Sequence, residues 1–222
     1  MKTIPVITLF LILVCGAVMP AAAENLSLRI EPGPRWEETT WLFLYRLKHH
    51  PQLAAWIETA DGRFVRTLVV SDSAARGSWR GNPDGGRPDA LPVWSHASRT
   101  AGSAGIDAAS SATPAAGVDS AWRTEELSPG GRYIIRLEIN NSFDYNEFWP
   151  KKARRGSESW SGVNGQPSVI YEASFTAGTA GLTQLEPAGQ GAVDGSDSRI
   201  RPGLHGLTTA LQIVSSAVLE QK

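Results

Sequence analysis

Cysteine is almost absent from this chain of 222 residues, and the single one, Cys15, lies in an apolar N-terminal segment. Lys2 gives that segment a positive start, and Ala21 to Ala23 supply the small residues that a signal peptidase reads. The pattern predicts a secretory signal peptide over residues 1–23 and one periplasmic domain over residues 24–222. That domain has no disulfide and no cysteine metal site, so it must be stabilised by burial alone.

An excess of charge of either sign is also missing, since the formal net charge is −1. Without a basic stripe, nucleic acid is not an expected partner. The apolar part of the signal is shorter than the roughly 20 residues of a membrane span, so stable membrane insertion is not expected either.

Recognisable catalytic patterns are lacking as well. No Ser-His-Asp order and no glycine-rich phosphate loop occurs in a convincing context. The adjacent His49 and His50 point to opposite faces of a strand, which disfavours a shared metal. We therefore assign no catalytic and no metal-binding residue, and we do not expect a stand-alone enzyme.

Short apolar runs bounded by turn residues predict β-strands through much of the chain. The runs cover Leu26–Ile30, Trp41–Leu47, Leu53–Thr59, Phe64–Val70, Arg132–Asn140 and Ser168–Phe175. The Trp41–Leu47 run is continuously apolar and aromatic, which favours a strand in the middle of a sandwich. Between two other runs, Asp61-Gly62 is a strong hairpin signal, in which we expect both turn residues to take positive φ.

The segment from Ser71 to Ser128 differs from the rest, because it is rich in Gly, Ala, Ser, Pro and Arg. Long loops of this kind are usually functional or disordered. Disordered segments are poor in aromatic residues, however, and this one contains Trp79, Trp94 and Trp122. We expect an ordered excursion held in place by these rings.

The C-terminal part begins with a loop-like segment over residues 178–206. Apolar spacing from Leu207 to Leu219 then fits a helical face, followed by a short strand at Ala217–Glu220. We expect an all-β fold, an antiparallel Ig-like β-sandwich with a long inserted Gly/Ala/Ser-rich loop and a short C-terminal helix.

One string within the excursion, Asp107-Ala-Ala-Ser-Ser-Ala-Thr113, carries candidate chemistry. It resembles the flavinylation motif of FMN-carrying extracytoplasmic domains, which reads Asp, two variable residues, Ser/Thr, Gly, Ala and Thr/Ser. The resemblance implies that a separate flavin transferase esterifies FMN to Thr113, with Asp107 and Ser110 as motif partners. Ser111 stands where that family has glycine. On composition alone, the string also fits a small-residue loop with no modification.

A second resemblance covers most of the chain from Leu53 to Leu219. In order, the matching pieces include Ala55-Trp-Ile-Glu58, Leu91-Pro-Val-Trp94, Ser142-Phe-Asp-Tyr-Asn-Glu147, Asn164-Gly-Gln-Pro-Ser168 and Gly206-Leu-Thr-Thr-Ala210. They are similar to a family of predicted bacterial periplasmic proteins, domain-of-unknown-function family 2271. The resemblance implies a periplasmic domain associated with flavin transferases and with membrane redox partners of the PepSY type.

A dense polar and aromatic cluster follows the Arg132–Asn140 run. Asp144, Tyr145 and Asn146 could form a ligand wall whose polar groups bond the edge of an isoalloxazine ring. The alternative is a turn, in which Asp and Asn close backbone hydrogen bonds. Trp94, on the approach to the motif string, completes the candidate cofactor-binding residues.

Two functions are compatible with these observations. In the first, a periplasmic sandwich carries covalent FMN on Thr113 and relays electrons near the membrane. In the second, a non-catalytic periplasmic sandwich binds a partner protein or a glycan through its tryptophan-rich loop.

Overall fold

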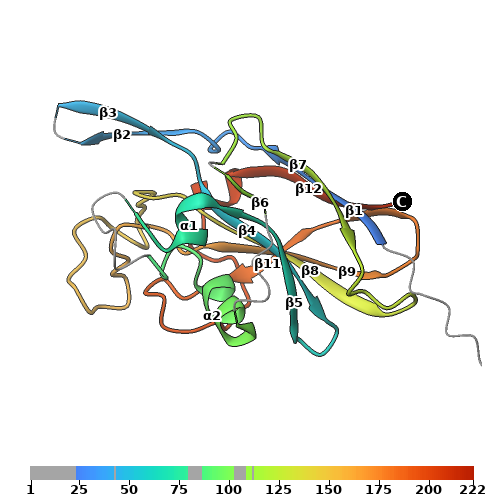
Figure 1. Ribbon diagram of the computed structural model, residues 1–222. Helices are drawn as coiled ribbons and strands as arrows, with labels where there is room; N and C mark the ends of the chain where they lie inside the picture. Colours follow the sequence, from blue (N-terminus) through green and yellow to red (C-terminus); the bar gives the residue numbers. More distant parts are fainter. Residues whose placement is uncertain (1–23, 43, 80–86, 103–108, 112) are drawn as a thin grey trace, which may run out of the picture.

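Two facing β-sheets form the body of the protein in the computed structural model, which describes residues 24–42, 44–79, 87–102, 109–111 and 113–222 (Figure 1). The predicted signal peptide lies outside the described residues. One sheet has the spatial order β10 (Gly181–Gln184), β12 (Val214–Gln221), β1 (Glu24–Pro32) and β7 (Val118–Thr124). The other has the order β11 (Glu186–Gln190), β9 (Val169–Thr176), β8 (Arg132–Asn140), β4 (Gln52–Thr59), β5 (Phe64–Ser71) and β6 (Ala109–Ser111).

The predicted all-β sandwich is confirmed. All pairings in these sheets are antiparallel except that of β5 with β6, which is parallel. Alternate residues of β1, namely Leu26, Leu28 and Ile30, are buried against the inner face of the six-stranded sheet. This period of two is what a strand with one covered face requires.

The six-stranded sheet is buried on both faces near its centre. Along β4 every residue from Leu53 to Glu58 is buried. Leu53, Ala55 and Ile57 join the core between the sheets. On the opposite face, Ala54 and Trp56 pack in a second cluster with residues of α2 (Pro92–Ala101). Two covered faces explain a continuous apolar strand in place of an alternating one.

The predicted hairpin at Asp61-Gly62 is confirmed. Strands β4 and β5 pair in antiparallel register from Ala54↔Val70 to Glu58↔Phe64. Only Gly62 takes a positive φ, at 85°, whereas both turn residues were expected to do so. The turn is closed by hydrogen bonds between Thr59 and Arg63, so glycine is needed at one position only.

The prediction of one central strand over Trp41–Leu47 is wrong. The run folds back on itself as a separate two-stranded hairpin of β2 (Glu38–Leu42) and β3 (Tyr45–His49), which projects from the body (Figure 1). Leu44 lies in its turn and is 88 % exposed, and Trp41 is 65 % exposed. An apolar run indicates strand, but it does not reveal whether another element covers it.

The excursion from Ser71 to Ser128 contains more regular structure than its composition indicates. Its described part includes α1 (Asp72–Arg76), α2, β6 and β7. Pro92 at the first position of α2 starts the helix, because its missing N–H costs nothing there. Among the described residues, no helix is long and apolar enough to cross a membrane.

The C-terminal part differs from the prediction in two details. The expected helix is a single 3-10 turn, η2 (Thr209–Gln212), and the following strand already begins at Val214. Strands β10 and β11 lie within the segment that was expected to be a loop. Both are short, and β11 contains Pro and Gly, so neither has a clear strand pattern.

Candidate ligand-binding site

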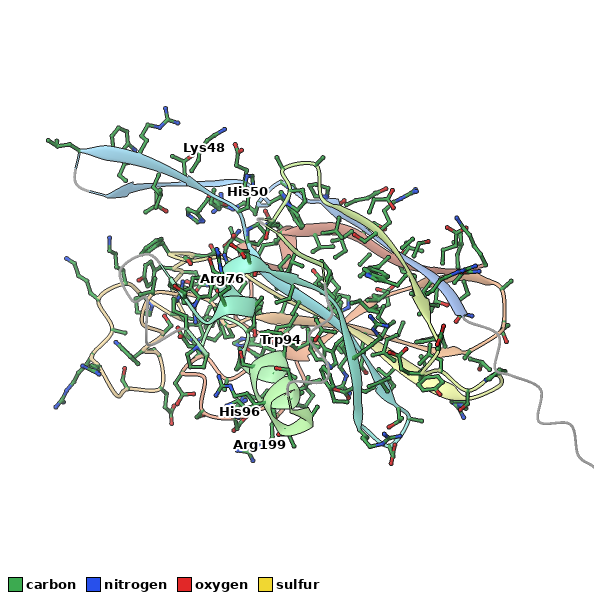
Figure 2. All side chains as sticks on the ribbon, viewed as in Figure 1. Lys48, His50, Arg76, Trp94, His96 and Arg199 are labelled. Atoms are coloured by element: carbon green, nitrogen blue, oxygen red, sulfur yellow. The ribbon has the colours of Figure 1, made fainter. Side chains whose placement is uncertain are left out.

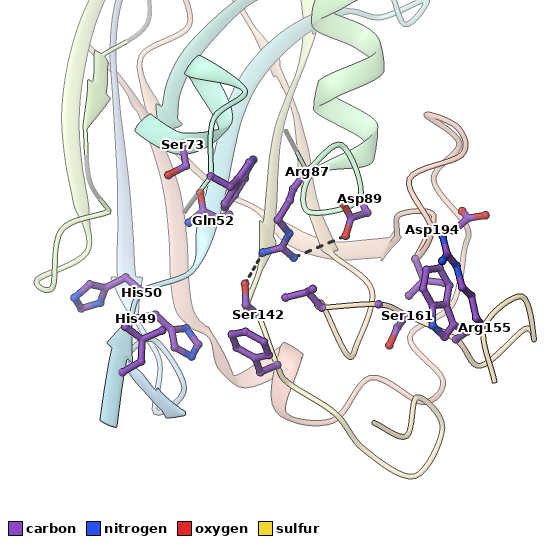
Figure 3. A pocket seen from close by; sticks show the side chains of 17 residues that line it. His49, His50, Gln52, Ser73, Arg87, Asp89, Ser142, Arg155, Ser161 and Asp194 are labelled. Atoms are coloured by element: carbon purple, nitrogen blue, oxygen red, sulfur yellow. Dashed lines mark hydrogen bonds and ion pairs between the residues drawn. The ribbon is translucent and has the colours of Figure 1, made fainter. Parts of the chain in front are cut away.

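A cavity of about 1060 Å³ lies beside the end of β4 where the chain enters that strand (Figure 3). Segments far apart in sequence form its walls. Leu47 and His49 come from β3, Arg87 precedes α2, Trp160 belongs to the connection between β8 and β9, and Asp194 follows β11. The volume is at the upper end of the range for small-molecule sites.

Arg87 is the best-connected cation of the cavity. Its guanidinium donates to the Ser142 hydroxyl at 2.8 Å and to the Asn164 side-chain oxygen, and it lies 3.8 Å from the Asp89 carboxylate. Burial lowers its pKa, while the negative charge of Asp89 raises it. An arginine held in this way remains a rigid cation, suited to an anionic ligand group.

Asn164 holds Asp89, the other member of the hydrogen-bond network around Arg87. Its amide donates to the Asp89 backbone carbonyl at 2.7 Å and to the Asp89 carboxylate at 2.9 Å. The side chain is fully buried. The network therefore ties the segment before α2 to the connection between β8 and β9, and it sets the position of Arg87.

Aromatic rings with cations above them line two parts of the cavity. The Arg87 guanidinium lies 4.9 Å from the centre of the Trp79 ring, and that of Arg155 lies 5.7 Å from the Trp160 ring. Phe143 also lines the cavity, with a φ of 64° that is rare for a bulky residue. Such strain clusters at functional sites, where surrounding structure maintains it.

Several polar atoms of the cavity wall are buried without a hydrogen-bond partner among the described residues. They are Nδ1 of His50, Nε1 of Trp79 and Oγ of Ser161. Leaving a buried polar group unpaired costs about 1–3 kcal/mol, so native proteins rarely tolerate several together. All three atoms belong to residues that line the cavity, but the atoms themselves have almost no accessible surface and lie behind the cavity wall.

His49, at the base of the β2–β3 hairpin, adds apolar character to the cavity at neutral pH. Burial, followed by the neighbouring His50, lowers the pKa of His49. The neutral ring lies 6.1 Å from Phe143 in an edge-on arrangement. No group of three or more metal-ligating residues exists in the described part of the chain, and the cavity's chemistry is aromatic and cationic.

Thr113, the candidate acceptor, lies next to this cavity. Its hydroxyl donates to the Pro51 carbonyl at 2.7 Å, and Pro51 stands between His50 and Gln52, which both line the cavity. The Trp36 indole donates to the Pro114 carbonyl at 2.9 Å and so holds the next residue. Thr113 is half-buried, with a defined position.

The rest of the motif string is only partly described. Asp107 lies outside the described residues. Ser110 and Ser111 belong to β6, where their backbones pair with Val70 and Ser71 of β5. The Ser71 hydroxyl donates to the side chain of Gln52, which lines the cavity. Ser111 therefore pairs at the edge of the sheet with Ser71, which contacts a residue that lines the cavity.

The polar side chains of the cluster that follows β8 form hydrogen bonds with other parts of the protein. Buried Asp144 accepts hydrogen bonds from Gln166 at 2.7 Å and from Thr209 at 2.5 Å. The Tyr145 hydroxyl donates to the Gly162 carbonyl at 2.7 Å. The Asp144 contacts are with side chains and not with the backbone groups of a turn, and Ser142 and Phe143 are the members of the cluster that line the cavity.

Asn146 and Trp94 likewise have structural contacts. The Asn146 side chain accepts from the backbone N–H groups of Phe148 and Trp149 and donates to the Gly206 carbonyl. Trp94 is buried on the outer face of the six-stranded sheet, and its indole donates to Thr67 at 3.0 Å. In the described structure neither residue lines the cavity.

Sequence reasoning missed most of the cavity's lining. Arg87, Asn164 and Trp160 lie in turn-rich segments whose composition gives no sign of a shared site. Trp79 was expected to hold the excursion in place, and its ring contacts Arg87, which belongs to the same excursion. Tryptophan is abundant in this chain, with eight residues, and that was the one available signal for an aromatic site.

The fold and the site define a β-sandwich with a ligand-sized, aromatic and cationic cavity at a sheet end. Residues 45–141 match a protein-family model described as Predicted periplasmic protein (DUF2271). The matched region runs from β3 to the residue after β8, and it contains Arg87 and Thr113. No curated protein and no solved structure matches the chain.

Proposed function

We propose that the protein is a periplasmic electron carrier, with FMN esterified to Thr113 and its ring system lodged in the neighbouring cavity. The observation that carries the proposal is the hydrogen bond of Thr113 to Pro51, because the two sequence neighbours of Pro51, His50 and Gln52, line the cavity. The resemblance of the motif string motivates the attachment to Thr113, and the match to a family of predicted periplasmic proteins supports the location alone.

The cavity residues fit such a group. Trp79, Phe143 and Trp160 offer flat surfaces for a planar ring. Gln52 and Ser73, which also line the cavity, offer polar groups for the edge of that ring. Arg87 and Arg155 supply positive charge for reduced, anionic states. Bound FMN would accept and pass on electrons, while these side chains hold it in one orientation and exclude water.

Attachment requires a flavin dinucleotide as donor and a separate flavin transferase. The Thr113 oxygen bonds to the phosphorus on the FMN side of the donor's pyrophosphate, and the bond from that phosphorus to the bridging oxygen breaks. AMP leaves with the bridging oxygen, and the threonine proton passes to a base of the transferase. Because the hydroxyl is half-buried and bonded to Pro51, the segment must first detach from this carbonyl.

The test is the intact mass of the protein after co-expression with a flavin transferase in the periplasm. We expect a gain of one FMN less one water in the wild type, and no gain in Thr113→Ala. Thr113→Ser keeps the hydroxyl and retains the gain. Ser111→Gly, which restores the glycine of the motif, raises the modified fraction. An unmodified wild type, with the transferase active on another substrate, would overturn the proposal.

Non-covalent binding of a glycan in the same cavity is the second candidate. It is favoured by the tryptophans in the cavity, because indole faces stack on sugar rings. In that case the protein stays unmodified and colourless under the same conditions. The PepSY-type membrane protein is the proposed electron partner only in the first case, so the mass experiment separates the two.

A further inference from the structure

The projecting β2–β3 hairpin has two different faces. The pairs Trp41↔Arg46 and Thr39↔Lys48 put these four exposed side chains on one face. The Arg46 guanidinium lies 6.0 Å from the Trp41 ring, and Figure 2 shows Lys48 on the side of the hairpin away from the body. Leu47 and His49 point to the other face, which forms a wall of the cavity.

The outward face combines apolar and cationic groups in a way that globular surfaces seldom do. Trp41 is 65 % exposed, and Leu44 in the turn is 88 % exposed. Within the described residues Arg46 makes no ion pair, and Lys48 is paired only with Glu37, at 2.7 Å. An exposed tryptophan and leucine flanked by cations are typical of segments that lie at a membrane–water interface.

A second basic element lies at the same end of the molecule. The loop of residues 150–156, between β8 and β9, contains Lys151, Lys152, Arg154 and Arg155 and no acidic residue. All four are exposed, and in the described part of the chain none forms an ion pair. Figure 1 shows the loop beside the end that carries the hairpin. Arg155 of the loop and Leu47 of the hairpin line the same cavity.

We propose that this end of the protein docks reversibly on a bilayer containing anionic phospholipids. Trp41 and Leu44 enter the headgroup region, while Arg46, Lys151 and Lys152 face the phosphates. The charges are spread over two elements and carried on long, mobile side chains, which suits a diffuse negative surface better than one protein epitope. The chain as a whole has a net charge of −1, so the attraction is local to this end.

The experiment is co-sedimentation of the purified protein with vesicles of phosphatidylcholine alone or mixed with phosphatidylglycerol. We expect binding only to the mixed vesicles, and its loss at about 0.5 M NaCl, where the Debye length is only a few ångström. The variants Trp41→Ser with Leu44→Ser, and Lys151→Gln with Lys152→Gln and Arg154→Gln, each lose about tenfold or more in partition.

Matched controls lie elsewhere on the surface. Leu182→Ser removes a leucine of β10 that is 74 % exposed, and a triple change of Arg63, Arg123 and Arg132 to Gln removes three exposed cations near the opposite strand ends. Both controls, and Thr113→Ala, keep wild-type binding.

Three results would overturn the proposal. One is a wild type that fails to bind the mixed vesicles at low salt. Another is a loss of vesicle binding in the arginine control equal to that of the loop variant, which would mean that positive charge anywhere on the surface supports binding. The third is concentration-dependent self-association, seen by sedimentation velocity, that the Trp41 and Leu44 changes abolish while vesicle binding is unaffected, since the hairpin would then join two copies.

Discussion

Gly165 shows how closely the backbone segments below the cavity approach each other. It has a φ of 77°, and it forms an isolated bridge with Asp144. A methyl group added there would lie 2.3 Å from the Asp144 carbonyl carbon and oxygen. Only glycine tolerates both the conformation and the contact.

Gly165→Ala is therefore expected to lower the free energy of unfolding by about 3 kcal/mol or more. Gly130→Ala is the matched control, because Gly130 also has a φ of 77° but open space around it. It should cost only about 1 kcal/mol, for the backbone conformation alone. Urea unfolding followed by tryptophan fluorescence measures both values. Equal losses in the two variants would show that the contact with Asp144 contributes nothing.

Helix α2 is attached to the sheet by one buried carboxylate. Glu138 of β8 accepts hydrogen bonds from the backbone N–H groups of Val93 and Trp94, at 3.2 and 2.7 Å, and from the Ser168 hydroxyl at 2.6 Å. The N–H groups in the first turn of a helix have no partner within the helix, so this carboxylate replaces a side-chain cap. The N-cap residue itself, Leu91, provides none.

This attachment makes stability dependent on pH. Burial raises the pKa of Glu138 from 4.5 to about 7, although the three donors oppose the shift. Because the folded state holds the proton more tightly than the unfolded state, the Glu138 contribution to the free energy of unfolding falls as pH rises from about 4.5 to about 7. Full titration is worth up to about 3 kcal/mol.

Thermal unfolding of wild type and Glu138→Gln across that pH range measures the effect. Glutamine cannot ionise, so only the wild type loses stability as residue 138 titrates. The difference in Tm between the two proteins should therefore shrink as pH rises from about 5 toward about 8. At low pH the variant is less stable than the wild type. The N–H group of the glutamine amide faces a backbone N–H group, and two hydrogen-bond donors cannot bond each other. A difference in Tm that stays constant with pH would contradict the shifted titration of Glu138.

At the scale of the whole molecule, the cavity exists only because distant segments meet at one end of the sandwich. Among the described elements, one helix and three strands separate Trp79 from Trp160 in sequence, yet both residues line one space. Arg87, Asn164 and Asp89 join these segments by hydrogen bonds. These hydrogen bonds hold the segment before α2 and the connection between β8 and β9 in one relative position.

This arrangement predicts that covalent attachment of the flavin to Thr113 and binding of its ring in the cavity depend on different residues. In protein modified on Thr113, Trp79→Leu should keep the added mass and weaken the visible circular dichroism of the flavin severalfold, because the ring loses its asymmetric contact. Trp122→Leu is the control, since Trp122 packs against the core between the sheets and does not line the cavity. An unchanged flavin spectrum in Trp79→Leu would place the ring outside the cavity.

Local patterns determined which segments are strands wherever burial is regular. Alternation in β1, the Asp61-Gly62 turn and the apolar runs of β4, β5, β8 and β9 follow from side-chain period and turn chemistry. The short motif also drew attention to Thr113 before its surroundings were known. Each of these signals resides in a few consecutive residues.

Tertiary structure alone decided what covers each strand and which residues share a site. The Trp41–Leu47 run is as apolar as a core strand, but within the described ranges no further strand pairs with it and it forms an exposed hairpin. Trp94, which was grouped with the motif by sequence, is buried away from the cavity, whereas Arg87 lines the cavity and is held there by a hydrogen bond to Asn164. Contacts between residues so far apart along the chain depend on the packing of the whole sandwich, and no local spacing encodes them.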